Sequence, residues 1–330
     1  MLLDLDGVLY LGPEPVAHAA EGVAAARRAG RAVAFVTNNA SRAVEEVAAA
    51  LGRVGIHAEP SDVVTSGQAA ARLVAERLPP GSAVLVMGSP ALAAQVAAAG
   101  LRPVRTLAEA GGDVAAVVQG LHPATTWADL AEATRAVHAG ALWVTGNRDG
   151  TLPSPDGPLP GNGTMVAAVA GATGREPLVA GKPEPALHAE SVARVGARRP
   201  LVVGDRLDTD VLGAVRAGAD SLLVLTGVVD VAALLAAAPG ERPTFVAADL
   251  RGLELPHPPV RTRDGETACG AWRAAVEGGT VRVRPAGAAT EPATGPAAHV
   301  EALRAACSAA WGARSDGAGV TAVEGLPDAG

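Results

Sequence analysis

Two aspartates stand almost at the beginning of the chain, where Asp4 and Asp6 flank Leu5 in the segment MLLDLDGVLYLG. In an extended strand alternate side chains share a face, so these carboxylates would lie about 6.5–7 Å apart. Like charges at that spacing repel each other, and a divalent cation between them and a substrate would relieve the repulsion. The alternative is an acidic strand end that faces solvent. The apolar start and the Gly7 that follows favour metal-dependent chemistry instead.

Further polar clusters follow three other predicted strands. They are Thr37 with Asn38 and Asn39, then Lys182, and then Asp205 with Asp208 and Asp210. In a parallel α/β sheet, ligands bind beyond the carboxyl ends of the strands. Four clusters, each at the end of its own strand, therefore predict one site built from strand ends.

Composition limits the classes of partner. The chain has 330 residues, is 49% hydrophobic and carries a net charge of -7, which argues against nucleic acid as a partner. No apolar run reaches membrane-span length, and no basic region with an apolar stretch after it opens the chain, so we expect neither a membrane partner nor a signal peptide. Cys269 and Cys307 lie far apart, which fits a reducing cytoplasm better than a disulfide framework.

The order of predicted elements defines the fold class. Short β-branched runs such as Arg31–Thr37 alternate with Ala-rich helical segments, which predicts an α/β protein with a doubly wound, Rossmann-like parallel sheet. A Pro-Pro-Gly segment at 79–81 suggests a boundary, and the first pattern resumes near residue 178. We therefore expect a core of residues 1–80 and 178–255, with an α/β cap inserted at 81–177.

The C-terminal region, 256–330, is predicted to be a small α+β accessory domain that follows a proline-rich linker. Its expected order is helix (Trp272–Val276), strand (Thr280–Arg284) and helix (His299–Trp311). Residues from Ser315 onward are small and polar, and we expect them to be disordered. Gly146–Gly163 is expected to be a long loop without secondary structure.

Four motifs resemble those of the haloacid dehalogenase (HAD) superfamily of phosphotransferases: DLDGV at 4–8, VTNN at 36–39, GKP at 181–183 and GDRLDTD at 204–210. TGNRD at 145–149 and PGNGTM at 160–165 are similar to the branch of p-nitrophenyl and glycerol-3-phosphate phosphatases, which carries a large inserted cap of type C2. The resemblance covers about 1–255. The added C-terminal domain resembles actinobacterial members whose tail is like part of an acetyltransferase fold.

The resemblance implies a phosphatase with an aspartyl-phosphate intermediate and Mg²⁺ as cofactor. Asp4 would be the nucleophile, and Asp6 would protonate the leaving alkoxide and then accept a proton from water. The expected metal ligands are the Asp4 carboxylate, the Asp6 backbone carbonyl and Asp205, with Asp210 orienting the waters on the metal.

The same resemblance implies a phosphate-binding set on other strand ends. Thr37, Asn38 and Asn39 would hold phosphate oxygens, and Lys182 would neutralise charge shared with the nucleophile. An acid at the position of Asp6 favours a phosphatase, since superfamily members that hydrolyse haloalkanes or drive pumps lack it.

The cap must supply specificity, and its candidate loop is Asn147–Pro160. The loop contains no aromatic residue to stack on a nucleobase or pyridine ring, which favours a small aliphatic ester such as glycerol 3-phosphate or 2-phosphoglycolate. Asn147, Arg148 and Asp149 could bind substrate hydroxyls or a carboxylate, or Asn147 and Asp149 could merely stabilise the loop turn.

Several alternatives stay open from sequence. The chain could be a broad aryl, nucleotide or pyridoxal phosphatase, a phosphotransferase, or a non-catalytic sensor of a phosphorylated ligand. Because the large cap would block the face of the core, the chain could form a homodimer through the cap. The tail lacks an Arg/Gln-x-x-Gly-x-Gly/Ala pyrophosphate loop, so acyl-CoA binding is not expected, and a structural, regulatory or interface role is.

Overall fold

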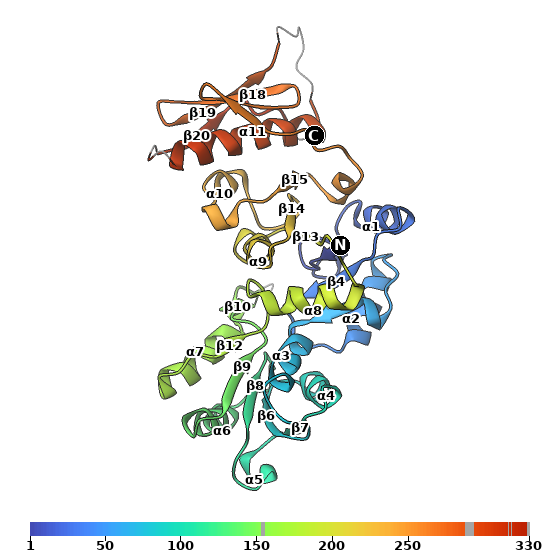
Figure 1. Ribbon diagram of the computed structural model, residues 1–330, viewed down its shortest axis with the longest axis vertical. Coiled ribbons are helices and arrows are strands. Elements are labelled where there is room, and N and C mark those ends of the chain that lie inside the picture. The colour runs from blue at the N-terminus through green and yellow to red at the C-terminus, as the bar shows by residue number, and fades with distance from the viewer. Residues whose placement is uncertain (153–155, 288–293, 316, 318, 329–330) are drawn as a thin grey trace. The chain divides into compact units, whose positions relative to one another are not determined.

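The computed structural model describes residues 1–152, 156–287, 294–315, 317 and 319–328. The chain divides into two compact units. Unit 1 consists of Met1, Leu3–Val33 and Arg199–Gly330, and unit 2 consists of Leu2 and Ala34–Arg198. Figure 1 labels their elements. Among the described residues, no helix combines the length and the apolar character needed to cross a bilayer.

The part of unit 1 that precedes the C-terminal region contains strands in the order β15-β14-β13-β1, and β14 runs parallel to both β13 and β15. The elements are β1 (Leu2–Leu3), β2 (Tyr10–Leu11), β3 (Glu14–Pro15), α1 (Ala19–Arg28), β13 (Leu201–Gly204), a π-helical turn η2 (Leu207–Val211), α9 (Leu212–Arg216), β14 (Asp220–Val224), α10 (Val231–Leu235), η3 (Pro239–Glu241), β15 (Phe245–Ala247) and η4 (Leu250–Leu253). The strands are short and almost wholly buried, as expected for parallel strands covered on both faces.

Unit 2 holds a parallel sheet of order β12-β9-β8-β6-β7, and its strands β4 and β5 pair in parallel with each other. Its strands are β4 (Ala34–Thr37), β5 (Val63–Thr65), β6 (Ala83–Met87), β7 (Arg102–Val104), β8 (Ala116–Gln119), β9 (Leu142–Thr145), β10 (Thr151–Leu152), β11 (Leu159–Pro160) and β12 (Leu178–Val179). Its helices are α2 (Val44–Arg53), η1 (Pro60–Asp62), α3 (Ser66–Ala75), α4 (Pro90–Ala98), α5 (Leu107–Ala110), α6 (Trp127–His138), α7 (Asn162–Thr173) and α8 (Pro185–Val195).

The segment 146–163 is not the structureless loop expected from its prolines and glycines. Thr151 pairs with Pro160 and Leu152 with Leu159, so β10 and β11 form a short antiparallel hairpin. Two exposed leucines, Leu152 and Leu159, lie on it. Residues 153–155 of the expected specificity loop lie outside the described residues.

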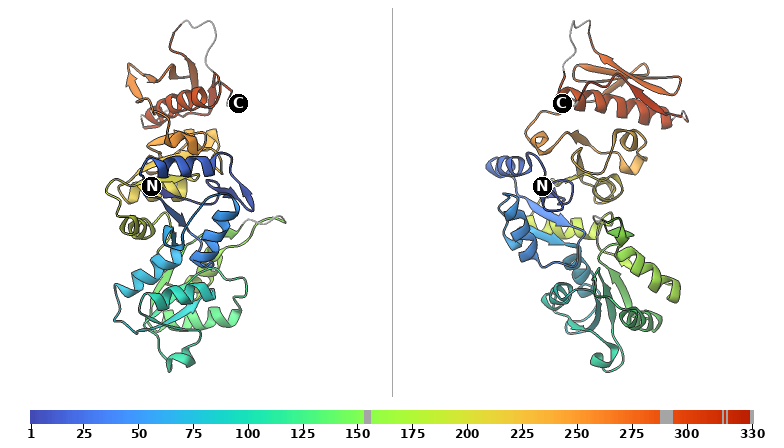
Figure 2. Two further views of the ribbon diagram at one scale, coloured as in Figure 1. Left: turned by 90° about the vertical axis from the view of Figure 1, so that its right-hand side faces the viewer. Right: turned by 180° about the vertical axis from the view of Figure 1, so that it is seen from behind.

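The C-terminal region of unit 1 is a sheet of order β16-β17-β18-β19-β20 with one long helix, α11 (Pro296–Ser315), across one face (Figures 1 and 2). Its strands are β16 (Arg261–Arg263), β17 (Glu266–Cys269), β18 (Trp272–Glu277), β19 (Thr280–Pro285) and β20 (Ala322–Glu324). The antiparallel pairs end at β19, which pairs in parallel with β20. The predicted α+β character is confirmed.

Two expectations about this region are wrong. Trp272–Val276 is a strand, not a helix, since burial alternates along β18 and Gly278–Gly279, both with positive φ, turn the chain back into β19. The end of the chain was expected to be disordered, yet Ala322–Glu324 forms an edge strand. Positions 316, 318, 329 and 330 lie outside the described residues.

The tail shares a hydrophobic core with the rest of unit 1. Leu223, Leu235 and Val246 from the β14–β15 region belong to the same buried cluster as Trp272 and Leu303. Small alanines on the buried face of α11 let the helix approach the sheet closely. The tail is therefore packed into the body of unit 1.

Candidate active site

Three carboxylates of unit 1 converge. Oxygens of Asp4, Asp205 and Asp210 all lie within 4.8 Å of one another. Asp4 follows β1 and Asp205 follows β13, while Asp210 lies in η2, one turn further on. Asp205 and Asp210 are each only 1% exposed. Negative charges this close in a buried place repel strongly, and a cation is the simplest compensation.

Backbone groups fix these carboxylates. The amide N of Val228 donates to Asp205 Oδ2 over 2.9 Å, and the amide N of Arg206 donates to Asp210 Oδ2 over 3.1 Å. Asp4 is anchored through its own backbone, since its amide N donates to the carbonyl O of Val203 over 2.9 Å. The cluster is therefore positioned before any ligand arrives.

Glycines provide the space that the cluster occupies. A Cβ at Gly7 or at Gly227 would overlap the Asp205 carboxylate, and one at Gly204 would overlap Asp210. Gly7 also has φ +81°, a conformation that favours glycine. Thr226 Oγ1 donates to the Gly7 carbonyl over 2.6 Å and ties the two segments that flank Asp205 together. Sequence reasoning did not single out Thr226 or Gly227.

This donor set fits Mg²⁺. Magnesium prefers hard oxygen ligands at about 2.0–2.1 Å, so ligands on opposite sides of one ion lie roughly 4.2 Å apart. The three carboxylates offer oxygens in that range. Asp210, expected only to orient waters, also offers an oxygen within 4.8 Å of the other two. Asp6 is exposed, and its backbone forms an isolated bridge with Tyr10.

The predicted phosphate-binding residues lie in unit 2, organised around Asn38. Asn38 Oδ1 accepts from the amide N of Lys182 over 2.7 Å, and Asn38 Nδ2 donates to the carbonyl O of Lys182 over 3.1 Å. The Lys182 side chain is buried, at 5% exposure. A Cβ at Gly181 would overlap both Asn38 Oδ1 and the Gly146 carbonyl, which explains the glycine before Lys182.

The carbonyl of Asn38 is held from two sides. Ser66 Oγ donates to it over 2.6 Å and Asn147 Nδ2 over 2.7 Å. We name Asn38, Ser66, Asn147 and Lys182 the Asn38 network. Sequence reasoning missed Ser66, although it directly follows strand β5 and so obeys the strand-end rule that identified the other clusters.

The side chain of Asn147 is occupied within the chain. Besides its bond to Asn38, its Oδ1 accepts from the amide N of Asp149 over 3.1 Å, and its carbonyl accepts from buried Asn162 over 2.7 Å. Asn147 is 6% exposed. These hydrogen bonds support the alternative that Asn147 stabilises the loop turn.

Two other predicted residues use their polar groups locally. The Thr37 hydroxyl, in a buried side chain, accepts from the amide N of Asn39 over 3.1 Å. Asn39 Oδ1 accepts from both the amide N and the hydroxyl of Ser41 over 2.7 Å. These bonds shape the turn after β4 into a compact loop ahead of α2.

Asp208 differs from its neighbours in the GDRLDTD segment. Its carboxylate pairs with the Arg206 guanidinium through two hydrogen bonds, of 3.0 and 2.7 Å. This hydrogen bond to Arg206 lowers the pKa of Asp208 below its ordinary value, against partial burial. Asp208 is not one of the three carboxylates whose oxygens lie within 4.8 Å of one another.

Comparison with known families covers most of the chain. A family model for haloacid dehalogenase-like hydrolases matches residues 1–102, and a HAD-hydrolase-like model matches 179–253. A GCN5-related N-acetyltransferase-like domain matches 269–328, which agrees with the acetyltransferase-like tail expected from sequence.

Among curated proteins, the chain is 53% identical over 253 residues to the D-glycerol 3-phosphate phosphatase of Mycobacterium tuberculosis, covering 77% of this chain and 70% of the relative. It is 35% identical over 229 residues to an acid sugar phosphatase of Staphylococcus saprophyticus, covering 69% of this chain and 86% of the relative.

Solved structures that match this chain also include phosphatases. A glycerol phosphate phosphatase from Mycobacterium tuberculosis in complex with magnesium matches with a TM-score of 0.84 and 45% identity, covering 98% of this chain and 92% of that one. A p-nitrophenyl phosphatase from Archaeoglobus fulgidus matches with a TM-score of 0.70 and 29% identity, covering 76% of this chain and 96% of that one.

Proposed function

This chain belongs to the haloacid dehalogenase-like hydrolases and is a Mg²⁺-dependent phosphatase of a small phosphorylated substrate, and we propose that this substrate is glycerol 3-phosphate. The observation that carries the proposal is the 53% identity to a D-glycerol 3-phosphate phosphatase, together with a structural match that extends through the tail. The absence of aromatic residues from Asn147–Pro160 supports a small aliphatic ester, with 2-phosphoglycolate as the second candidate.

In the proposed reaction Asp4 attacks phosphorus, the bond from phosphorus to the leaving oxygen breaks, and Asp6 gives its proton to that oxygen. Water then attacks the aspartyl-phosphate, Asp6 takes the proton, and phosphate leaves with Asp4 restored. Asp4, Asp205 and Asp210 would hold Mg²⁺ together with the Asp6 backbone carbonyl. Bound Mg²⁺ would neutralise negative charge on the transferring phosphoryl group.

Lys182, Thr37, Asn38 and Asn39 are proposed to bind the phosphate oxygens. The support is geometric, since the Asn38 side chain accepts from the amide N of Lys182 and donates to its carbonyl O. A lysine whose main chain is fixed in this way needs little reorganisation when charge develops on the phosphate. Asp149 is retained as a candidate contact to substrate hydroxyls.

Other expectations remain part of the proposal. They are the catalytic core at 1–80 and 178–255, the cap at 81–177 and the accessory domain at 256–330, together with a cytoplasmic location, a homodimer through the cap, and no nucleic-acid or membrane partner. A non-catalytic sensor is not retained, since the curated relatives are enzymes.

The deciding experiment measures Mg²⁺-dependent phosphate release and compares kcat/KM for glycerol 3-phosphate, 2-phosphoglycolate, pyridoxal 5'-phosphate and UMP. We expect glycerol 3-phosphate to exceed the ring-bearing substrates at least tenfold, which corresponds to about 1.4 kcal/mol of transition-state binding. Chelation by EDTA should abolish release, and added Mg²⁺ should restore it. If pyridoxal 5'-phosphate or UMP is preferred, the substrate proposal fails while the phosphatase chemistry stands.

A further inference from the structure

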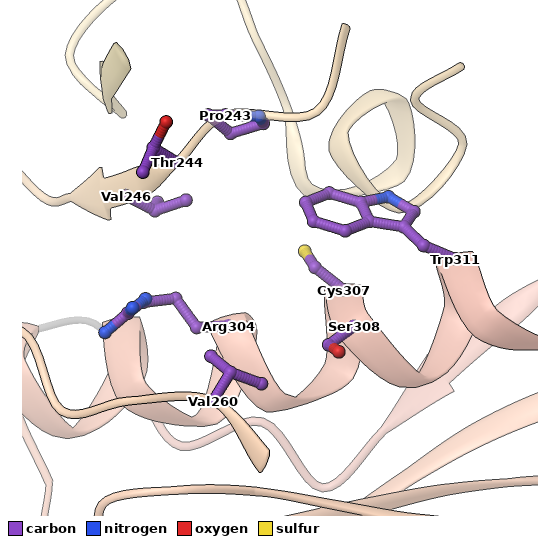
Figure 3. A pocket seen from close by; sticks show the side chains of 8 residues that line it. All are labelled: Pro243, Thr244, Val246, Val260, Arg304, Cys307, Ser308 and Trp311. Atoms are coloured by element: carbon purple, nitrogen blue, oxygen red, sulfur yellow. The ribbon is translucent and has the colours of Figure 1, made fainter. Parts of the chain in front are cut away.

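A cavity of about 180 Å³ lies in unit 1 where the tail helix α11 meets the segment around β15 (Figure 3). From α11 it is lined by Arg304, Cys307, Ser308 and Trp311, and from the β15 segment by Pro243, Thr244 and Val246; Val260, on the segment ahead of β16, lies beside α11 (Figure 3). Figure 3 shows the α11 side chains opposite the β15 segment. None of these residues belongs to the carboxylate cluster or to the Asn38 network.

Arg304 is the only ionisable group with a full charge among the lining residues. Its side chain is 92% removed from solvent, with 8% exposure, and its Nη1 donates to the carbonyl O of Pro258 over 2.9 Å. Across the described ranges, no carboxylate forms an ion pair with it. A buried guanidinium has five N–H donors and a charge to compensate, and one carbonyl does not balance that charge.

The neighbouring groups do not supply the missing anion. Glu301, one turn earlier on α11, accepts from the amide N of Ala271 over 3.2 Å and lies against Gly270. Burial raises the pKa of the Cys307 thiol to about 12, so that thiol is neutral at pH 7. The positive charge of Arg304 is therefore available to a ligand.

The rest of the cavity lining offers mainly apolar surface, which suits the apolar part of a ligand. Trp311 Nε1 donates to the carbonyl O of Leu234 over 3.0 Å, so the indole N–H is already used and the ring contributes apolar surface. Val246, Val260 and Pro243 add aliphatic surface. Ser308 lies one helical turn after Arg304 and adds a hydroxyl to the lining.

Size and charge restrict the ligand further. A cavity of roughly 150 Å³ is known to accept benzene, whereas drug-sized sites start near about 300 Å³. The cavity is therefore too small for a nucleotide or an acyl-CoA. With one cation in its lining it matches a monoanion, and the planar guanidinium matches a carboxylate through two parallel hydrogen bonds.

We propose that this cavity binds a small organic carboxylate, whose carboxylate group pairs with Arg304 while its apolar body contacts Trp311 and Val246. The site is separate from the phosphatase site, and the proposal does not depend on glycerol 3-phosphate being the substrate. Because the walls come from both the tail and the β15 region, an occupied cavity would stabilise their packing.

The test uses the full-length protein and benzoate as the probe, with benzamide as its neutral counterpart. Isothermal titration calorimetry should show benzoate binding at least tenfold more tightly than benzamide, and saturating benzoate should raise Tm. Equal affinity for the two compounds, or no binding of benzoate, would overturn the proposal, since the Arg304 charge would then play no part.

Two variants locate the binding. Arg304→Gln should weaken benzoate binding at least tenfold, whereas Arg314→Gln, on the same helix and outside the lining, should leave it unchanged. If Arg304→Gln fails to fold, Val260→Phe decides, because it keeps Arg304 and fills the cavity. Benzoate binding to a folded Val260→Phe with wild-type affinity would show that the ligand binds elsewhere. Phosphate release by each folded variant checks that the phosphatase site is intact.

Discussion

The carboxylate cluster and the Asn38 network differ in the number of charged side chains that they contain and in how those side chains are held. The cluster of Asp4, Asp205 and Asp210 gathers negative charges within 4.8 Å, with glycines leaving room around them. The Asn38 network contains a single charged side chain, Lys182, and connects its members by short hydrogen bonds between amides, a hydroxyl and backbone groups. One region concentrates charge for a ligand, and the other fixes backbone positions.

This difference predicts that mutations in the two regions affect stability and activity differently. Without a cation, mutual repulsion makes the cluster a source of instability, so removing one carboxylate should cost activity and leave the fold stable. The Asn38 network contributes to the fold itself, since a removed donor leaves a buried carbonyl with fewer partners. Mutations in the network should therefore lower stability and turnover together.

The largest effect is expected for Asp4→Asn. The amide cannot act as the nucleophile, so phosphate release should fall at least about 10⁴-fold. Tm and the far-UV circular dichroism spectrum should stay close to those of the wild type. Substantial residual turnover would overturn the assignment of Asp4 as nucleophile.

The second prediction concerns the space around Asp205. Gly227→Ala places a methyl group where the Asp205 carboxylate lies, and should weaken Mg²⁺ affinity by roughly 10- to 100-fold. Titration of activity with Mg²⁺ gives the affinity. Gly171→Ala in α7, where a Cβ meets open space, is the matched control and should leave affinity unchanged. Equal Mg²⁺ affinities for the two variants would contradict the idea that Gly227 leaves the space that the Asp205 carboxylate needs.

The third prediction separates positioning from substrate contact at Asn147. Asn147→Ala and Ser66→Ala each remove one donor to the Asn38 carbonyl, and each should lower the free energy of unfolding by about 1–3 kcal/mol and reduce kcat. Denaturant unfolding and steady-state kinetics measure both effects. An Asn147→Ala variant with raised KM and unchanged stability, beside a silent Ser66→Ala, would instead indicate that Asn147 contacts substrate.

The smallest effect is expected for Asp208→Asn, at pH 7. The lowered pKa of Asp208 means that its contribution to stability is complete above the unfolded-state pKa and is lost as pH falls through the folded-state pKa. Its exposed pair with Arg206 should contribute no more than about 1 kcal/mol. The difference in Tm between variant and wild type should therefore shrink on acidification, with kcat/KM nearly unchanged. A large loss of kcat/KM would move Asp208 into the active site.

The sequence predicted the phosphatase part better than the tail. Strand-end motifs and buried β-branched runs are local signals, and the expected HAD fold, capped branch and Mg²⁺ dependence are confirmed. In the tail, the alanines and arginine of Trp272–Val276 favour a helix by propensity, yet β17 and β19 pair with this segment on both sides. Pairing with distant residues outweighed propensity.

The sequence alone determined which side chains follow which strands, because strand periodicity and the order of motifs along the chain are local properties. That Asp210 joins Asp4 and Asp205, and that Asn147 donates to the carbonyl of Asn38, 109 residues away, was decided by tertiary packing. A hydrogen bond between such distant residues leaves no periodic trace in the sequence. The space for Asp205 beside Gly7 and Gly227 likewise exists only once the segments that carry them have packed together.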